Sequence, residues 1–237
     1  MSRLAIVAAL EREVRPLVKR WRVHDREHSG RRFRFYENGE TILVCAGIGA
    51  EPARRAAEAI LALYSPNCVY SVGYAGALDP TLRTGDILQP ARVVDTKDGS
   101  SASIVGGRGT LVSHALIASA AHKAKLRESY NAQAVDMEAS AIARAAEARG
   151  IAFAAVKAIS DEFNFELPAT EQFVDSQGRF QQTRFAVFVA LRPWLWARVA
   201  QLARNSARAT RNLCAELQKM LAEEISVDRS AHVAGRH

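Results

Sequence analysis

Cysteine and metal-binding motifs are scarce in this chain of 237 residues. Its three cysteines, Cys45, Cys68 and Cys214, are widely spaced and form no CxxC pair, which argues against a disulfide framework and is typical of a reducing cytosol. The six histidines form neither an HExxH motif nor a cluster with cysteine, so the sequence predicts no metal site. We therefore expect a cytoplasmic protein that works with its own side chains and needs no cofactor.

Long apolar runs are also missing, since no segment approaches the ~20 residues of a membrane span. Residues 4–10 are apolar but lack a small-residue cleavage site and run directly into Glu11, so we interpret them as a first strand rather than a signal segment. The net charge of +7 permits nucleic acid or an anionic surface as a partner. No nucleic-acid motif accompanies it, and the basic cluster at 15–34 is interpreted as a solvated face.

The sequence is 49% apolar and 24% charged, an ordinary globular composition, and short apolar runs alternate with helical patterns. The patterns predict strands at 4–10, 32–37, 41–47, 67–73, 86–95, 133–135 and 152–159, and helices at 11–21, 49–64, 137–149 and from 180 onward with a break near Asn205. This alternation predicts an α/β fold with a mixed, mainly parallel twisted sheet flanked by helices. We expect one domain at 1–225, including a C-terminal helical segment at 180–225, and a polar tail at 226–237.

Acidic residues follow three of the predicted strands, namely Glu13, Glu138 and Asp161, and two glycine turns at 47–49 and 73–77 follow two more. Singly, these residues have ordinary explanations: acids complement the dipole of a helix start, and glycines permit tight turns. In a parallel sheet, however, the loops after the strands meet at one edge, where ligands bind. The combination therefore predicts a shared site at that edge.

These motifs resemble those of the purine and uridine phosphorylases and the 5′-methylthioadenosine/S-adenosylhomocysteine nucleosidases. The resemblance rests, in order, on AIVAALEREV, CAGIG, SVGYAGAL, TGDIL, VDMEASAIA and VKAISDE, and it covers roughly residues 3–161. A shortened middle, the ELP after Asp161 and the long C-terminal helices resemble the hopanoid-associated nucleoside phosphorylase branch.

The resemblance implies a role for each acidic residue. Asp161, oriented by Ser160, would protonate N7 of a departing purine, since an oxocarbenium-like transition state needs a neutral leaving group. Glu138 would accept hydrogen bonds from the ribose hydroxyls while Met137 packs against the sugar. Glu13 would activate the attacking water.

Other positions are assigned by the same resemblance. Glu11 is a less suitable base than Glu13, and Asp136 is interpreted as structural. Further substrate contacts are expected from Ile48, Gly73, Tyr74 and Ala75, and an anion site from Gly47, Gly49 and Arg54.

The sequence favours hydrolysis over phosphorolysis. At the second glycine turn the family's phosphorylases resemble RVGSCG, whereas this chain has SVGYAG, so Ser71 replaces an arginine and Tyr74 replaces a serine. We expect cleavage of a 5′-modified adenosine such as methylthioadenosine or adenosylhomocysteine. The alternatives are a phosphorylase acting through Arg54 or Arg55, with an adenosyl-hopanoid as a candidate substrate, and a nucleoside-binding protein without turnover.

The C-terminal segment at 192–221 combines tryptophans with arginines, a pattern that suits a helix on an anionic membrane surface. It suits equally a helix docked on its own domain or on a second subunit, which is what we expect. A homodimer binding a small nucleoside is the expected assembly. The shortened region at 96–130 leaves the closure of the purine pocket open, and His114 within it is interpreted as structural.

Overall fold

The computed structural model describes residues 3–116, 118–165, 171–173, 181, 184–185, 188–189 and 192–234. The strands are β1 (Leu4–Ala8), β2 (Arg22–His28), β3 (Arg31–Asn38), β4 (Thr41–Cys45), β5 (Cys68–Ala77), β6 (Ile87–Leu88), β7 (Arg92–Asp95), β8 (Ser101–Ser103), β9 (Thr110–Ser113), β10 (Ala134–Asp136) and β11 (Ala152–Asp161). The helices are α1 (Glu11–Val18), α2 (Ala50–Tyr64), α3 (Ala120–Tyr130), α4 (Ala139–Glu147) and α6 (Trp196–Ala234), with short 3-10 turns at Glu171–Phe173 and Pro193–Leu195.

The strands form one mixed sheet in the order β2-β3-β4-β1-β5-β10-β9-β7-β8, with β11 beside β5 and β6 beyond it. At its centre β1 runs parallel to β4 and β5, and β5 runs parallel to β11. The long strand β5 joins the two halves, because its first half pairs with β1 and its last residues pair with β10. The predicted α/β fold with a mixed sheet is confirmed.

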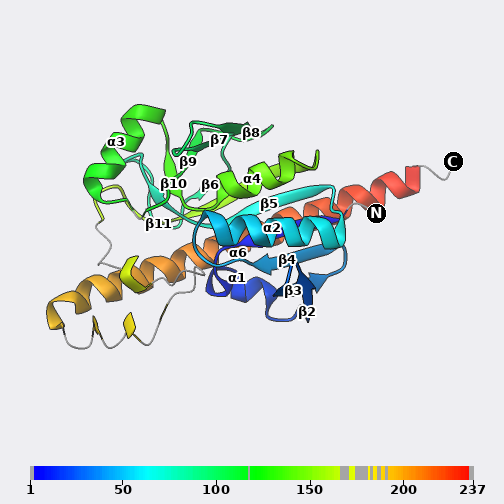
Figure 1. Ribbon diagram of the computed structural model, residues 1–237, viewed down its shortest axis with the longest axis horizontal. Coiled ribbons are helices and arrows are strands. Elements are labelled where there is room, and N and C mark those ends of the chain that lie inside the picture. The colour runs from blue at the N-terminus through cyan, green and yellow to red at the C-terminus, as the bar shows by residue number, and fades with distance from the viewer. Residues whose placement is uncertain are drawn as a thin grey trace.

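Helices cover both faces of the sheet (Figure 1), and alternation along β1 shows how each face is buried. Ala5 and Val7 contribute to a core with α2 and α4. Leu4, Ile6 and Ala8 contribute to a second core with α1 and α6. Because successive side chains of a strand point to opposite faces, an unbroken apolar run such as LAIVA is what a strand covered on both sides requires.

Helix α6 runs the length of the molecule, and its two ends extend beyond the sheet (Figure 1). The predicted break near Asn205 is wrong: residues 196–234 contain no glycine or proline to interrupt the helix. Ala209, Leu213 and Leu217 are fully buried in the second core, so this part of the C-terminal segment docks on its own domain. Among the described residues, no helix has the length and apolar character of a membrane span.

Several elements differ from the sequence pattern. Strand β2 lies in the predicted basic surface, and both β8 and α3 lie in the shortened region at 96–130, for which the sequence patterns predict no strand or helix. Residues 73–77, predicted as a glycine turn, continue β5, and Ser160 and Asp161 belong to β11 itself. Most of the helix predicted at 180–191, and the ELP motif at 166–168, lie outside the described residues.

Candidate active site

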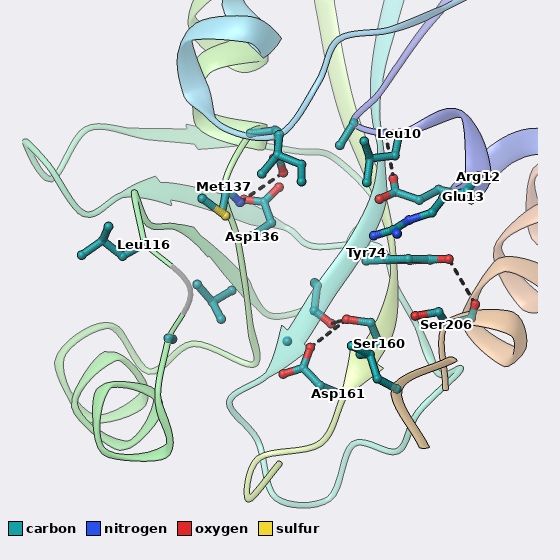
Figure 2. A pocket seen from close by; sticks show the side chains of 18 of the residues that line it. Leu10, Arg12, Glu13, Tyr74, Leu116, Asp136, Met137, Ser160, Asp161 and Ser206 are labelled. Atoms are coloured by element: carbon teal, nitrogen blue, oxygen red, sulfur yellow. Dashed lines mark hydrogen bonds between the residues drawn. The ribbon is translucent and has the colours of Figure 1, made fainter. Parts of the chain in front are cut away.

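A cavity of about 430 Å³ opens between the carboxyl end of β1, the middle of the sheet and the first half of α6 (Figure 2). This volume lies in the range usual for small-molecule sites. Glu13, Glu138 and Asp161 all line it, although they come from α1, the start of α4 and the end of β11. The three carboxylates predicted to share a site therefore do share one cavity.

The topology that brings them together differs from the expected one. Strand β10, which precedes Glu138, runs antiparallel to β5 rather than parallel to it. Its partners are Gly76 and Ala77 at the far end of β5, so β10 leads the chain back toward the middle of that strand. Glu138 therefore reaches the cavity from the opposite direction to Glu13.

Glu13 lies in the first turn of α1 and is almost completely buried, with a relative exposure of 3%. Burial, and then the negative charge of Glu138, raise the pKa of this carboxyl to about 8, against the opposing positive charges of Lys157 and Arg12. Gly73 on β5 makes room for it, since a Cβ atom there would lie 2.7 Å from Glu13 Oε2. A carboxylate with this pKa is suited to take a proton near neutral pH.

Glu138 lies at the N-cap of α4 and is held by two backbone donors, Met137 beside it and Gly49 at the N-cap of α2. The Gly49 amide donates to Oε1 at 2.7 Å, and the Met137 amide donates to Oε2 at 3.2 Å. Burial, and then the charge of Asp136, raises the pKa of Glu138 to about 7. The Gly49 amide, predicted to hold an anionic ligand, thus binds a carboxylate of the protein.

Asp161 ends β11 and accepts hydrogen bonds on both oxygens. The Ser160 hydroxyl donates to Oδ1 at 2.7 Å, as Figure 2 shows, and the Lys123 ammonium lies 2.5 Å from Oδ2. Lys123 Nζ also donates to the Glu162 carbonyl at 2.8 Å. Gly76 on β5 permits this approach, because a Cβ atom there would lie 2.9 Å from Asp161 Oδ2.

A second buried ion pair lies beneath the carboxylates. Lys157 Nζ is 2.8 Å from Asp136 Oδ2 and donates to the Ser71 hydroxyl at 2.9 Å. Ser113 donates to the other oxygen of Asp136 at 2.6 Å, and the Ala139 amide donates to Oδ2. These contacts fit the structural interpretation of Asp136, although one side of the residue lines the cavity.

Tyr74 ties the cavity to α6. Its hydroxyl shares a 2.5 Å hydrogen bond with Thr210 Oγ1 and donates to the Ser206 carbonyl at 3.1 Å, so it points toward α6, as Figure 2 shows. The first half of α6 forms an apolar wall of the cavity with Val199 and Leu202. The helix therefore belongs to the site as well as to the core.

The remaining predicted site residues fall into two groups. Those that line the cavity are Ile48, Tyr74, Ala75, Met137 and Ser160, whereas Gly47, Gly49, Gly73 and Arg54 do not. Arg54 lies on the exposed side of α2 in ion pairs with Glu51 and Glu58, and Arg55 also pairs with Glu51. This placement does not support an anion site at Arg54.

Two basic residues that line the cavity were missed by sequence reasoning, Arg12 and Lys123. Arg12 directly precedes Glu13 in the motif, so its place beside the site could have been found from that neighbour. Lys123 gives no such signal, since a lysine in the polar stretch AHKAKLRES resembles a solvated helix residue. His114 shares a hydrogen bond with Thr96 and does not line the cavity. The described residues contain no cluster that could hold a metal ion.

The α/β fold thus brings three buried carboxylates together around one cavity of a size usual for small molecules. The chain belongs to the phosphorylase superfamily, whose family model matches residues 3–119 and 108–191. The family resemblance expected from the motifs is thereby confirmed.

Named relatives agree with this assignment. Aminodeoxyfutalosine nucleosidase of Campylobacter jejuni is 24% identical over 208 residues, covering 70% of this chain and 91% of that protein. The 5′-methylthioadenosine/S-adenosylhomocysteine nucleosidase of Staphylococcus epidermidis is 26% identical over 211 residues, covering 73% and 92%. The solved structure of the Helicobacter pylori 5′-methylthioadenosine/S-adenosylhomocysteine nucleosidase shares the fold, with a TM-score of 0.70 at 16% identity, covering 94% of this chain and 99% of that one.

Proposed function

We propose that this protein is an N-ribosyl hydrolase that releases the base from a purine nucleoside, with a 5′-modified adenosine such as methylthioadenosine or adenosylhomocysteine as substrate. The observation that carries the proposal is the meeting of Glu13, Glu138 and Asp161 in one largely buried cavity. Burying three carboxylates together is costly, and a ligand that uses each of them offsets that cost. The named nucleosidase relatives support the same reaction class.

Each carboxylate has a distinct task in this reaction. Departure of the base leaves positive charge on the ribose, and the base leaves readily only as a neutral molecule. Asp161 delivers the proton to N7, and Glu138 accepts hydrogen bonds from the 2′- and 3′-hydroxyls. Glu13, whose raised pKa makes it an effective base, takes a proton from the water that attacks C1′.

The apolar wall of the cavity supports a substrate with an apolar 5′ group. Leu116, Phe185, Val199 and Leu202 line the cavity but bring no polar group to it. An apolar substituent packed against them would leave water, which favours binding by about 25 cal/mol per Å² of buried apolar area. A 5′-alkylthio group fits this requirement better than the 5′-hydroxyl of adenosine.

Phosphorolysis is the second candidate, and Arg12 is the observation that favours it. Its side chain lines the cavity and its charge acts on Glu13, close to where the nucleophile would approach. Arginine is well suited to bind phosphate through paired N–H donors. An adenosyl-hopanoid, with a lipid-like 5′ group, is a candidate substrate in this case.

Adenine release from methylthioadenosine, adenosylhomocysteine and adenosine, with and without phosphate, tests the proposal. Release without phosphate and formation of the free sugar support hydrolysis. Release that requires phosphate and is lost in Arg12→Ala supports phosphorolysis. Tight binding of these nucleosides without release would show a nucleoside-binding protein and would overturn the proposed activity.

Assembly and location are part of the proposal. We keep a cytoplasmic homodimer as the proposed state, to be checked by the mass of the purified protein in solution. Because α6 docks on its own domain, the residues proposed for any membrane contact are the exposed tryptophans Trp194, in the turn before α6, and Trp196, the first residue of α6. If the wild-type and Trp194→Ser/Trp196→Ser proteins sedimented equally with anionic vesicles, the two tryptophans would not bind a membrane surface.

A further inference from the structure

Lys123 is a buried cation inside the cavity that the three-carboxylate scheme does not use. It lies in the first turns of α3 and has a relative exposure of 1%. Its ammonium contacts Asp161 Oδ2 at 2.5 Å and the Glu162 carbonyl at 2.8 Å, and the residue lines the same cavity as the carboxylates. Burying an ammonium costs several kcal/mol before its partners compensate, so its position calls for an explanation.

The contact between Lys123 and Asp161 raises the question of where the proton that the departing purine requires comes from. Asp161 accepts hydrogen bonds from an ammonium on Oδ2 and from the Ser160 hydroxyl on Oδ1. A carboxylate that accepts on both oxygens has no proton of its own to give. The proton delivered to the base must therefore come from one of its donors, and the ammonium is the more acidic of the two.

We propose that Lys123 supplies the proton for departure of the base and passes it through Asp161. This inference rests on the proposed nucleosidase or phosphorylase function. An N–H bond of the Lys123 ammonium breaks as an O–H bond forms on Asp161, and an Asp161 O–H gives its proton to N7. The electron pair of the C1′–N bond moves to the base, leaving Lys123 as a neutral amine and Asp161 as a carboxylate. Solvent reprotonates Lys123 after the products leave.

The charges in the site favour this transfer. The Lys123–Asp161 pair has no net charge as an ion pair or as an amine beside a carboxylic acid, so moving the proton within it separates no charge. As the ribose becomes cationic, the positive charge on Lys123 disappears, so the total charge of the cavity stays constant.

Lys123 acts through Asp161, so it is a positioning residue that supplies a proton. An experiment must distinguish this role from a purely structural role of the same lysine. A structural lysine would hold α3 against the end of β11, and its loss would impair every substrate equally. A proton-supplying lysine matters only when the leaving group needs a proton. A nitrophenyl riboside, whose leaving group departs as a stable anion, distinguishes the two.

The test compares wild-type protein, Lys123→Met and Lys123→Arg on an adenine nucleoside and on p-nitrophenyl riboside. Lys125→Met is the matched control, since Lys125 is an exposed lysine on the same helix. We expect Lys123→Met to lose about 100-fold or more in kcat for adenine release, the scale of general acid catalysis. Its KM and its rate with the nitrophenyl substrate should stay close to those of wild type, and its residual adenine release should rise as the pH falls.

Lys123→Arg keeps the positive charge but holds its proton throughout the working pH range. We expect Lys123→Arg to keep the ion pair with Asp161, and with it the melting temperature of the protein, without restoring adenine release. Equal losses on both substrates in both variants, or full adenine release by Lys123→Met, would overturn the inference. A wild-type protein that releases no adenine would instead refute the proposed function.

Discussion

At the scale of single residues, the glycines of β5 determine how closely the carboxylates approach the sheet. A Cβ atom at Gly76 would lie 2.9 Å from Asp161 Oδ2, which is the flexible end of a side chain rather than backbone. We expect Gly76→Ala to displace the carboxyl while the fold is retained. Adenine release should fall on the order of ten- to a hundredfold, because small misplacements of a catalytic group have effects of this size. Steady-state kinetics check the expected loss of rate, and the melting temperature checks that the fold is retained. A large fall in Tm with an unchanged rate would contradict both expectations.

Asp161 itself should affect both catalysis and stability. Asp161→Asn should reduce the rate by about two or more decades while substrate affinity is retained, since the amide cannot transfer the proton. The same change leaves the Lys123 ammonium buried without its counter-charge, and breaking a buried pair costs about 3–5 kcal/mol. Adding Lys123→Met should recover part of that stability. Denaturant unfolding of the two single variants and the double variant measures this coupling, and strictly additive losses would contradict it.

Glu13 should make stability depend on pH with a defined sign. Its folded pKa of about 8 lies above its ordinary value of 4.5, so the folded state binds the proton more tightly than the unfolded chain does. Below pH 4.5 both states are protonated and the residue costs nothing. Between pH 4.5 and 8 the unfolded chain ionises first, so the free energy of unfolding falls as the pH rises, by an amount on the order of a few kcal/mol.

Glu13→Gln removes this titration. Its Tm relative to wild type should therefore increase from pH 5 to pH 9. Both proteins keep the slope that comes from Glu138, whose pKa is also raised, so that slope does not enter the difference. Activity should be lost in the variant, and in wild type kcat/KM should increase as Glu13 ionises toward pH 8. A Tm difference that is constant across this range would show that Glu13 has an ordinary pKa.

At the scale of whole elements, α6 provides the apolar wall that we relate to the 5′ group. Leu202→Ser should raise KM for 5′-alkylthio adenosines by about tenfold, and more for longer chains, because burying a leucine-sized contact is worth about 1.5–3 kcal/mol. The KM for adenosine and all kcat values should change little. Gln201→Ser, an exposed neighbour on the same helix, is the control. An equal change in KM for every substrate would show that Leu202 of α6 does not contact the 5′ group.

The elements also show what local sequence can predict. Strands such as β1 and β4 are clear because apolar runs covered on both faces leave a continuous pattern. Strand β2 is mostly exposed and polar on both faces, and α3 buries only Lys123 and Leu126, so neither has a visible period. The direction of β10 depends on its pairing with β5, which lies more than fifty residues away and is not encoded locally.

The same reasoning applies to the site. The three carboxylates could be predicted because each occurs in a recognisable motif beside a strand. The ion pair between Lys123 and Asp161 spans 38 residues and depends on the packing of α3, which leaves no trace in the spacing of either motif. Contacts made by tertiary packing alone are therefore the part of the site that sequence does not supply.

At the scale of the whole molecule, the decisive question is where the folded domain ends. The sequence pattern predicts that the domain ends at residue 225, with a helical segment before it and a polar tail after it. Ala209, Leu213 and Leu217 of α6 are buried in the same core as β1 and α1, whereas the helix beyond them extends past the sheet (Figure 1). The core therefore needs α6 at least as far as Leu217.

Two truncations test this division. A chain ending at residue 225 should unfold at nearly the wild-type temperature and keep its activity, because it retains the buried residues Ala209, Leu213, Cys214 and Leu217. A chain ending at 195 loses Leu213 and Leu217, and since each buried leucine contributes about 2–5 kcal/mol, it should not remain folded. Circular dichroism melting of both chains measures the outcome. If the shorter chain melted cooperatively near the wild-type temperature, folding would not require α6. Other residues would then have to form the apolar wall of the cavity.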